Sequence, residues 1–282
     1  MQRLHDLAQD ALFRLRDRPL PGPDTPPQLL ACDGGLGLVR EAGGLRILDL
    51  PAAAAPAPRF DLSPLIDHTL LKAEATAGEV DQLCDEAAAY GFASVCVNPA
   101  RVARAAARLR GSGVRVCTVA GFPLGATPAR QKASEAASAL EDGAQEVDLV
   151  LALGPARDGD WAEVASEFAL LRRTVPAGSA VLKVILETCY LDEAQKREAC
   201  RLAVEAGLDF VKTSTGFGPA GATEADVALL RASVGAALGV KASGGIRDYE
   251  AAYRMVRAGA TRLGLSASLA VARGGQGASS GY

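Results

Sequence analysis

The chain has 282 residues, of which 49% are apolar and 22% charged, and its formal net charge is −3. This composition is typical of a folded globular protein and excludes disorder for most of the chain. The acidic balance argues against nucleic acid or an anionic membrane as a partner, and no apolar run approaches the 18 residues of a membrane span. The length suits two average domains or one eight-stranded α/β barrel.

The first 60 residues differ in composition from the rest of the chain. Leucine and alanine recur at helical spacing over residues 4–15, which predicts a short amphipathic helix. A proline-rich connector follows, then the segment 29–50, in which we expect two short strands, and then the linker PAAAAPAPR. No chemistry is apparent here, so we interpret residues 1–60 as an appended arm that packs on a partner subunit. The charged N-terminus has no apolar core of a secretory signal, which favours a cytoplasmic protein.

A regular alternation of strand and helix patterns begins at residue 61 and continues to about residue 270. Eight short apolar, β-branched segments are predicted strands: 65–71, 93–98, 114–122, 146–153, 181–187, 209–215, 239–245 and 261–267. Alanine-rich helical patterns lie between them, near 76–90, 99–111, 128–142, 160–174, 192–206, 223–236 and 248–258. We expect residues 271–282 to form a flexible tail.

Helix start signals support this assignment. Thr76 with Glu79 forms a predicted capping box, and Asp192 and Thr223 precede two other helices. Strands that alternate with helices form a parallel sheet, and eight units favour a closed (β/α)₈ TIM barrel over an open sheet. No G-x-G-x-x-G motif follows an early strand, so the fingerprint of a dinucleotide-binding fold is absent. In a barrel, the carboxyl ends of the strands form the active site.

The cysteines and histidines limit the metal and redox chemistry. Six cysteines occur without a C-x-x-C pair, at positions Cys32, Cys84, Cys96, Cys117, Cys189 and Cys200. In a large chain without a secretion signal, this pattern favours reduced thiols. The histidines are His5 and His68, too few for a histidine-rich zinc site. We therefore expect no metal and no cofactor.

Lysine is scarce, and half of the lysines lie in predicted strands. The chain has six lysines among its 30 basic residues, and three of them occur in VLKVILE, FVKTST and GVKAS: Lys183, Lys212 and Lys241. Lysine is seldom buried without a reason. One interpretation is that the ammonium groups reach solvent from the strand ends. The other is chemical: Lys212 forms a Schiff base, and the cation of Lys241 on the next strand lowers the pKa of that amine.

Carboxylates accompany these lysines. Asp148 lies in the apolar strand EVDLVL, where it would pair with a strand lysine or act as a general acid and base, and the two roles are compatible. Asp67 in LIDHTLL is a candidate for binding a substrate hydroxyl. Lys183 and Glu187 are expected to form an ion pair that lines the pocket. Cys96 and Cys117 are expected to be small core residues.

Two glycine-containing loops follow the last two predicted strands. SGGIR at 243–247 and GLSAS at 264–268 both lead toward helices. Backbone N–H groups at such places bind phosphate, and barrels often hold phosphate after strands seven and eight. The alternative is that both loops are simple tight turns.

Taken in order, the motifs LIDHTLLKAEAT, SVCVNP, VAGFPLGAT, EVDLVL, LKVILET, FVKTSTGFG and VKASGGIR, with a terminal Tyr282, resemble the deoxyribose-phosphate aldolase family. The resemblance covers residues 61–268 and implies a class I, metal-independent aldolase on a (β/α)₈ barrel. Such an enzyme cleaves 2-deoxy-D-ribose 5-phosphate to D-glyceraldehyde 3-phosphate and acetaldehyde in deoxynucleotide catabolism. It also implies a homodimer.

The resemblance assigns roles to individual residues. Lys212 would form the Schiff base, Lys241 and Asp148 would relay protons, and Tyr282 would assist proton transfer at the enamine carbon. The implied substrate-binding residues are Asp67, Thr69, Cys96, Lys183 and Thr215. The implied phosphate-binding residues are Gly216, Gly244, Gly245, Gly264 and Ser266. Phe217 stands where some members have a lysine, so one phosphate cation is missing and Arg247 would compensate.

Alternatives with other functions remain. The chain could be another Schiff-base aldolase of phosphorylated sugars, or a transaldolase-like enzyme. It could also be a relative that binds a sugar phosphate without turning it over, although such a protein has no need of a buried lysine pair. The tail that ends in Tyr282 could be uninvolved. A subunit-interaction protein that uses the N-terminal arm is a further hypothesis.

Overall fold

The structure is a computed structural model that describes residues 28–33, 36–41, 44–49 and 60–274. It comprises two compact units, Met1–Leu62 and Ser63–Tyr282. The helix predicted near residues 4–15, the linker after residue 50 and Tyr282 lie outside the described residues. No helix in the described ranges is long and apolar enough to cross a membrane.

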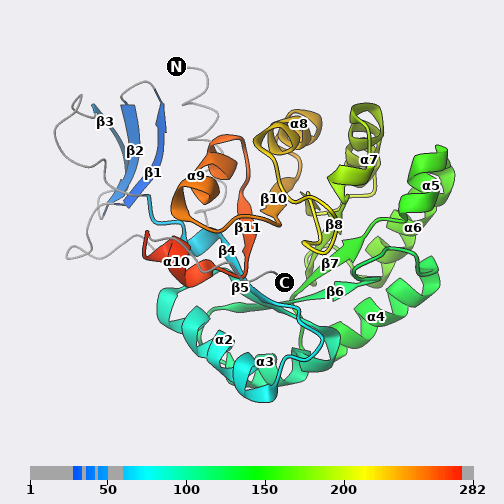
Figure 1. Ribbon diagram of the computed structural model, residues 1–282, viewed down its shortest axis with the longest axis horizontal. Helices are drawn as coiled ribbons and strands as arrows, with labels where there is room; N and C mark the ends of the chain where they lie inside the picture. The colour runs from blue at the N-terminus through cyan, green and yellow to red at the C-terminus, as the bar shows by residue number, and fades with distance from the viewer. Residues whose placement is uncertain (1–27, 34–35, 42–43, 50–59, 275–282) are drawn as a thin grey trace. The chain divides into compact units, whose positions relative to one another are not determined.

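The first unit contains a three-stranded antiparallel sheet in the order β1-β2-β3, drawn in blue in Figure 1. Its strands are β1 (Gln28–Asp33), β2 (Leu36–Glu41) and β3 (Gly44–Asp49). The prediction of two strands in this segment was wrong. Residues 28–49 contain three strands of six residues each.

The second unit is a closed barrel of eight parallel strands, in which β11 pairs with β4 to complete the ring (Figure 1). The strands are β4 (Ile66–Leu70), β5 (Ser94–Val97), β6 (Arg115–Ala120), β7 (Glu146–Val150), β8 (Val181–Ile185), β9 (Phe210–Lys212), β10 (Gly239–Ser243) and β11 (Arg262–Leu265). Each lies within a segment that the sequence predicted as a strand, and the TIM-barrel prediction is confirmed.

Helices surround the barrel. The α-helices are α2 (Ala77–Tyr90), α3 (Val102–Arg108), α4 (Ala129–Glu141), α5 (Leu153–Asp158), α6 (Trp161–Thr174), α7 (Glu193–Glu205), α8 (Glu224–Val234), α9 (Tyr249–Arg257) and α10 (Ser268–Ala272). Short 3₁₀ turns form η1 (Ser63–Leu65), η2 (Pro99–Arg101) and η3 (Thr188–Tyr190). The sequence missed α5, which is too short to show a clear helical period, whereas α10 begins where the loop at 264–268 is expected to lead into a helix.

The predicted helix starts have the expected chemistry. Thr76 and Glu79 form a reciprocal capping box at α2, and Asp192 does the same with Gln195 at α7. Thr223 accepts the N–H of Asp226 at α8. These caps satisfy N–H groups that have no partner inside the helix.

Alternation along the strands separates an apolar outer shell from a charged interior. On β7 and β8, the fully buried residues Val147, Leu149, Leu182 and Val184 alternate with charged residues. Side chains of a strand point to opposite faces in turn, so the apolar set packs under the helices while the charged set meets inside the barrel. The charged side chains of these strands therefore lie on the inner face of the barrel.

Candidate active site

The strand register brings the three strand lysines and Asp148 together inside the barrel. Asp148 on β7 lies opposite Lys183 on β8, and Lys212 on β9 lies opposite Lys241 on β10. None of the four is more than 3% exposed. Because neighbouring parallel strands place paired residues at the same height, these side chains converge toward the barrel axis.

Asp148 accepts contacts from all three ammonium groups. Its Oδ2 lies 2.7 Å from the Nζ of Lys212 and 2.7 Å from the Nζ of Lys241. Its Oδ1 lies 2.6 Å from the Nζ of Lys183. The sequence expectation of an ion pair between Asp148 and a strand lysine is confirmed, and a single carboxylate links Lys212 and Lys241.

A second set of charges lies next to the first. The Nη1 of Arg262 lies 2.6 Å from Asp67 Oδ1 and 3.0 Å from Glu146 Oε2. Glu146 Oε2 lies 2.7 Å from Lys183 Nζ, and Asp67 pairs with Lys241. The hydroxyl of Ser94 donates to Asp67 Oδ1 at 2.7 Å. Buried charges persist only when they are paired in this way.

The pKa values follow from this pairing. Burial alone would raise the pKa of Asp148, but Lys183, Lys212 and Lys241 outweigh burial and hold it well below its usual range. Burial opposes the charge of Lys241, yet Asp148 and Asp67 raise its pKa well above the usual value. The pKa of Lys183 is raised well above its usual value for the same reason: Asp148, Cys117 and Glu146 outweigh the effect of burial. Asp148 is thus a carboxylate, and Lys183 and Lys241 are cations.

The least exposed side chains inside the barrel include one more basic group than carboxylates. Contacts of 4.0 Å or less join three carboxylates to four basic side chains that are at most 13% exposed: Asp67, Glu146, Asp148, Lys183, Lys212, Lys241 and Arg262. Three of the basic side chains suffice to neutralise the three carboxylates. Arg115, whose side chain is half exposed to solvent, also reaches Glu146 at 3.6 Å. The neutral form of a lysine is the nucleophilic one.

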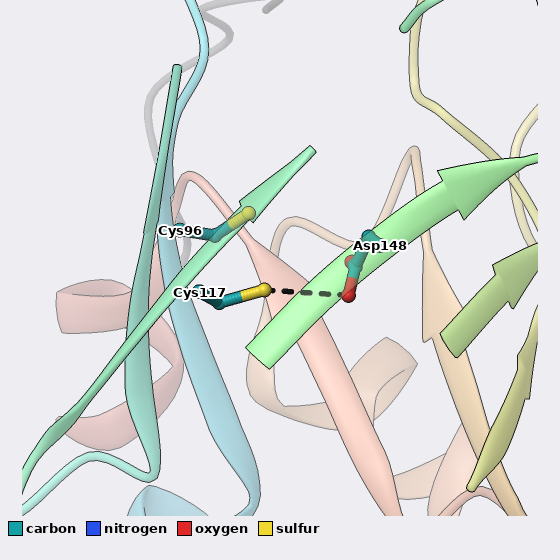
Figure 2. Close-up of side chains that lie close together, drawn as sticks. All are labelled: Cys96, Cys117 and Asp148. Atoms are coloured by element: carbon teal, nitrogen blue, oxygen red, sulfur yellow. Dashed lines mark hydrogen bonds between the residues drawn. The ribbon is translucent and has the colours of Figure 1, made fainter. Parts of the chain in front are cut away.

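Two cysteines lie beside Asp148, as Figure 2 shows. Cys117 Sγ is 3.3 Å from Asp148 Oδ1 and accepts the Nζ of Lys183 at 3.3 Å. Burial raises the pKa of the Cys117 thiol, whereas a hydrogen bond with Cys117 lowers the pKa of Cys96. Both cysteines are fully buried beside Leu71 and Val119, which confirms that they are core residues.

Cys96, Cys117 and Asp148 place three potential metal-binding atoms close together. Three ammonium groups already contact Asp148, and one of them contacts Cys117. Positive charge at this distance opposes a metal ion. The donor set therefore fits a proton-transfer site better than a metal site.

The expected ion pair between Lys183 and Glu187 is wrong. Lys183 points inward from β8 and is engaged by Asp148 and Glu146. Glu187 lies beyond the end of the strand, where its carboxylate accepts the backbone N–H and the hydroxyl of Thr215. The pairing could not be read from the local sequence because the closer partners of Lys183 come from another strand.

The predicted phosphate loops contain glycines that their backbone requires. Gly216, Gly244 and Gly245 have φ values of +90°, +86° and +78°, which side chains rarely adopt. At Gly264, a Cβ atom would lie 2.9 Å from the Cβ of Ser243 and 3.1 Å from the Cε of Lys241. The absence of a side chain at Gly264 thus leaves room beside Lys241.

The other predicted site residues have different surroundings. Thr69 donates its hydroxyl to the backbone oxygen of Asp67 at 2.8 Å. Ser266 is exposed and lines a small pocket with Thr69 and Lys72. Phe217 is 45% exposed, and its ring meets that of Phe122 edge-on at 5.3 Å.

Sequence reasoning missed Glu146 and Arg262 as members of the charged interior. Both have a signal that points to them. Glu146 stands two residues before Asp148 on β7, and Arg262 stands two residues before Gly264 on β11. Residues two apart on a strand share a face, so the inward-facing Asp148 predicts an inward-facing Glu146.

Comparison with known proteins shows that the chain is similar to aldolases. The model of the DeoC/LacD family of aldolases matches residues 63–282. A deoxyribose-phosphate aldolase from Geobacillus sp. (strain WCH70) is 52% identical over 214 residues, which cover 76% of this chain and 96% of that protein. A deoxyribose-phosphate aldolase from Thermococcus gammatolerans is 50% identical over 221 residues, which cover 78% of this chain and 98% of that protein.

Solved structures show the same likeness. The deoxyribose phosphate aldolase from Aeropyrum pernix has a TM-score of 0.68 and 36% identity, and the match covers 75% of this chain and 89% of that one. The aldolase QR15 has a TM-score of 0.72 and 41% identity, with coverage of 76% and 95%. The chain belongs to the DeoC/LacD family of aldolases.

Proposed function

We propose that the chain is a Schiff-base aldolase that reversibly cleaves 2-deoxy-D-ribose 5-phosphate to D-glyceraldehyde 3-phosphate and acetaldehyde. The observation that carries this proposal is the buried Lys212–Asp148–Lys241 arrangement, in which one carboxylate oxygen lies 2.7 Å from both amines. The names of the relatives supply the substrate. Breaking the C2–C3 bond of an aldehyde sugar requires an acceptor for the electron pair, and an iminium at C1 provides it.

The geometry supports a proton relay during the formation of the iminium. The neutral amine of Lys212 attacks the C1 carbonyl of the open-chain sugar and forms a carbinolamine, which loses water to give the iminium. Asp148 accepts and returns protons, and the ammonium of Lys241 donates them through the shared carboxylate. Between these proton transfers Asp148 is ionised beside the iminium nitrogen, so it also stabilises the positive charge that develops there.

Cleavage then releases the first product. Removal of the proton from the C3 hydroxyl turns C3 into the carbonyl of D-glyceraldehyde 3-phosphate, and the C2–C3 electron pair moves into the iminium to form an enamine. A proton added at C2 and hydrolysis of the resulting iminium release acetaldehyde and restore Lys212. We assign the C2 proton transfer to Tyr282, which lies outside the described residues.

We place the phosphate against the glycine loops at Gly216, Gly244, Gly245, Gly264 and Ser266. The left-handed backbone of the first three supports this assignment, since consecutive N–H groups in such turns form anion-binding hollows. With Phe217 at the position of a lysine in some relatives, we expect backbone N–H groups and Arg247 to hold the phosphate.

The remaining substrate-side assignments are Asp67, Thr69, Cys96, Lys183 and Thr215. Asp67 forms an ion pair with Lys241, and Lys183 forms one with Asp148. These ion pairs support a role for Asp67 and Lys183 in holding Lys241 and Asp148 in place. We propose a homodimer; a relative from Aeropyrum pernix is described as tetrameric. Cytoplasmic localisation also remains a proposal.

Borohydride reduction in the presence of 2-deoxy-D-ribose 5-phosphate tests the reaction. We expect a stable adduct on the peptide that contains Lys212, seen by mass spectrometry, and no adduct in Lys212→Ala. A chelator should change neither the adduct nor turnover. A folded protein that forms no adduct would instead be a sugar-phosphate-binding relative without catalysis, and products other than acetaldehyde would indicate a different Schiff-base aldolase.

A further inference from the structure

Glu187 has a backbone conformation that its residue type does not favour. It follows the carboxyl end of β8 and has φ +50° and ψ +63°, and no other non-glycine residue in the described ranges has a positive φ. The side chain is only 2% exposed. An L-residue adopts this conformation at a cost, and such strain persists where the surrounding contacts impose it, often at functional sites.

The carboxylate of Glu187 organises the turn that follows the Schiff-base strand. Its two oxygens lie 3.2 and 3.3 Å from the backbone nitrogen of Thr215, and it also accepts the Thr215 hydroxyl. Thr215 Oγ1 in turn accepts the N–H of Phe217 at 3.1 Å. One carboxylate therefore fixes the turn from Thr215 to Phe217 through both the backbone and the side chain of Thr215.

The carboxylate of Glu187 and the Thr215–Phe217 turn depend on each other. Burial raises the pKa of Glu187, and the hydrogen bonds from Thr215 oppose that rise. The carboxylate also packs against the next part of the loop, since a Cβ atom on Gly218 would lie 3.2 Å from its carboxyl carbon. The turn and the buried carboxylate thus hold each other in place.

This turn contains Gly216, which lies four residues after Lys212 in the sequence and has a φ of +90°. The N–H groups of its two neighbours, Thr215 and Phe217, are used inside the turn. No acceptor among the described residues takes the N–H of Gly216. The turn therefore leaves this one N–H for an external anion.

We propose that Glu187 is a positioning residue that shapes the Thr215–Phe217 turn so that the N–H of Gly216 binds the phosphate of the substrate. The inference rests on the proposed function, because the phosphate is that of the sugar. It assigns to Glu187 a part in the preference for phosphorylated over unphosphorylated sugar.

The test compares kcat/KM for 2-deoxy-D-ribose 5-phosphate with kcat/KM for 2-deoxy-D-ribose. Glu187→Gln keeps the size of the side chain but loses one acceptor oxygen and the charge. Glu187→Gly suits a positive φ and removes the carboxylate. In both variants we expect the ratio of the two kcat/KM values to fall about 10-fold or more, mainly through a higher KM for the phosphorylated sugar. Glu193→Gln, an exposed position on α7, is the matched control and should retain the ratio.

Inorganic phosphate gives a readout that does not depend on turnover. Titration calorimetry should show the Kd for phosphate rising about 10-fold or more in both Glu187 variants, in step with the kinetic ratio. Borohydride trapping of acetaldehyde, which has no phosphate, checks that Lys212 and its pocket are intact in each variant. If a Glu187 variant fails this check, Thr215→Val tests the same turn from its other side, with the same expected loss of phosphate affinity.

The outcomes separate the inference from the function. An unchanged ratio and unchanged phosphate affinity in Glu187→Gly would overturn the inference, because the residue would then matter only as backbone. Equal losses with both sugars would overturn it as well. A wild-type protein that cleaves neither sugar would refute the proposed function, whereas the phosphate titration would still decide the role of Glu187.

Discussion

At the scale of single residues, Asp148 is the carboxylate that contacts all three strand lysines of the site. It is fully buried, carries three lysine contacts on two oxygen atoms, and remains ionised because those contacts outweigh the cost of burial. Lys183 and Lys241 also contact other carboxylates, whereas Asp148 is the carboxylate that contacts Lys212 in the structure. A change at either Lys183 or Lys241 therefore alters the balance of charges around Lys212.

Replacing Lys241 tests this balance. In Lys241→Leu, two cations remain to face three carboxylates, so a proton on Lys212 becomes favourable and the nucleophile is lost at neutral pH. We expect kcat/KM to fall about 100-fold or more, with partial recovery as the pH is raised. The measurement is a pH–rate profile beside that of Lys196→Leu, whose lysine pairs with Asp226 outside the barrel. Full activity of Lys241→Leu at neutral pH would contradict the electrostatic argument.

His68 predicts a pH dependence of stability. Burial lowers its pKa below 6.5, although Glu86 at 2.8 Å acts in the opposite direction. Between the folded pKa and 6.5 the unfolded chain binds more protons, so the free energy of unfolding falls as the pH falls, by at most about 1.4 kcal/mol per pH unit. Urea unfolding at about pH 7 and about pH 5.5 should show a smaller loss in His68→Gln. An identical loss in both proteins would exclude His68 as the source.

At the scale of elements, a buried ion pair connects two helices to the end of a strand beside the site. Lys132 on α4 is fully buried, and its Nζ lies 2.7 Å from Glu167 on α6 and 2.8 Å from the backbone oxygen of Val150 on β7. Glu167 also accepts the N–H of Ala152 at 3.2 Å. The pair thus fixes the carboxyl end of the strand that carries Asp148.

Removing one partner of this pair should be costly. In Lys132→Met the carboxylate of Glu167 is left buried and unpaired, and we expect a loss of about 3–5 kcal/mol in the free energy of unfolding. The double variant Lys132→Met with Glu167→Met should recover most of it, because two apolar side chains leave no buried charge. Lys196→Met, which breaks a more exposed pair, should lose less than about 1 kcal/mol. Chemical denaturation compares the three, and additive effects in the double variant would refute the coupling.

At the scale of the whole molecule, the described residues of the proposed reaction centre all come from the second unit. The family model begins at residue 63, and the first proposed site residue is Asp67. The three-stranded sheet of the first unit supplies none of the strands of the barrel. The chemistry therefore belongs to the part of the chain after residue 62.

Deleting residues 1–58 tests this division. We expect the shortened chain to keep kcat/KM within about two-fold and to form the borohydride adduct on Lys212, because the barrel ring closes without the first unit. Light scattering on both forms would show whether the arm changes the number of subunits. A shortened protein that is folded but inactive would show that the first unit contributes to the site.

The alternation of strand and helix could be predicted from the sequence because eight apolar segments and several capping signals recur in order. Lys212, Lys241 and Asp148 could be found because charged residues in apolar strands need a partner. The short helix α5, the third strand of the first unit and the partner of Lys183 could not be found. Short elements show too little periodicity, and the competing partners of Lys183 lie on other strands.

By itself, the sequence determined that three lysines and several carboxylates would lie on strands of one barrel, since strand periodicity and residue type are local properties. The tertiary structure alone decided which charges meet. Closure of the ring brings Asp67 to Arg262 across 195 positions of sequence and Asp148 to Lys241 across 93. Each charge is stabilised by the partner that the barrel places nearest to it, and electrostatic attraction depends on distance in space rather than on distance along the chain.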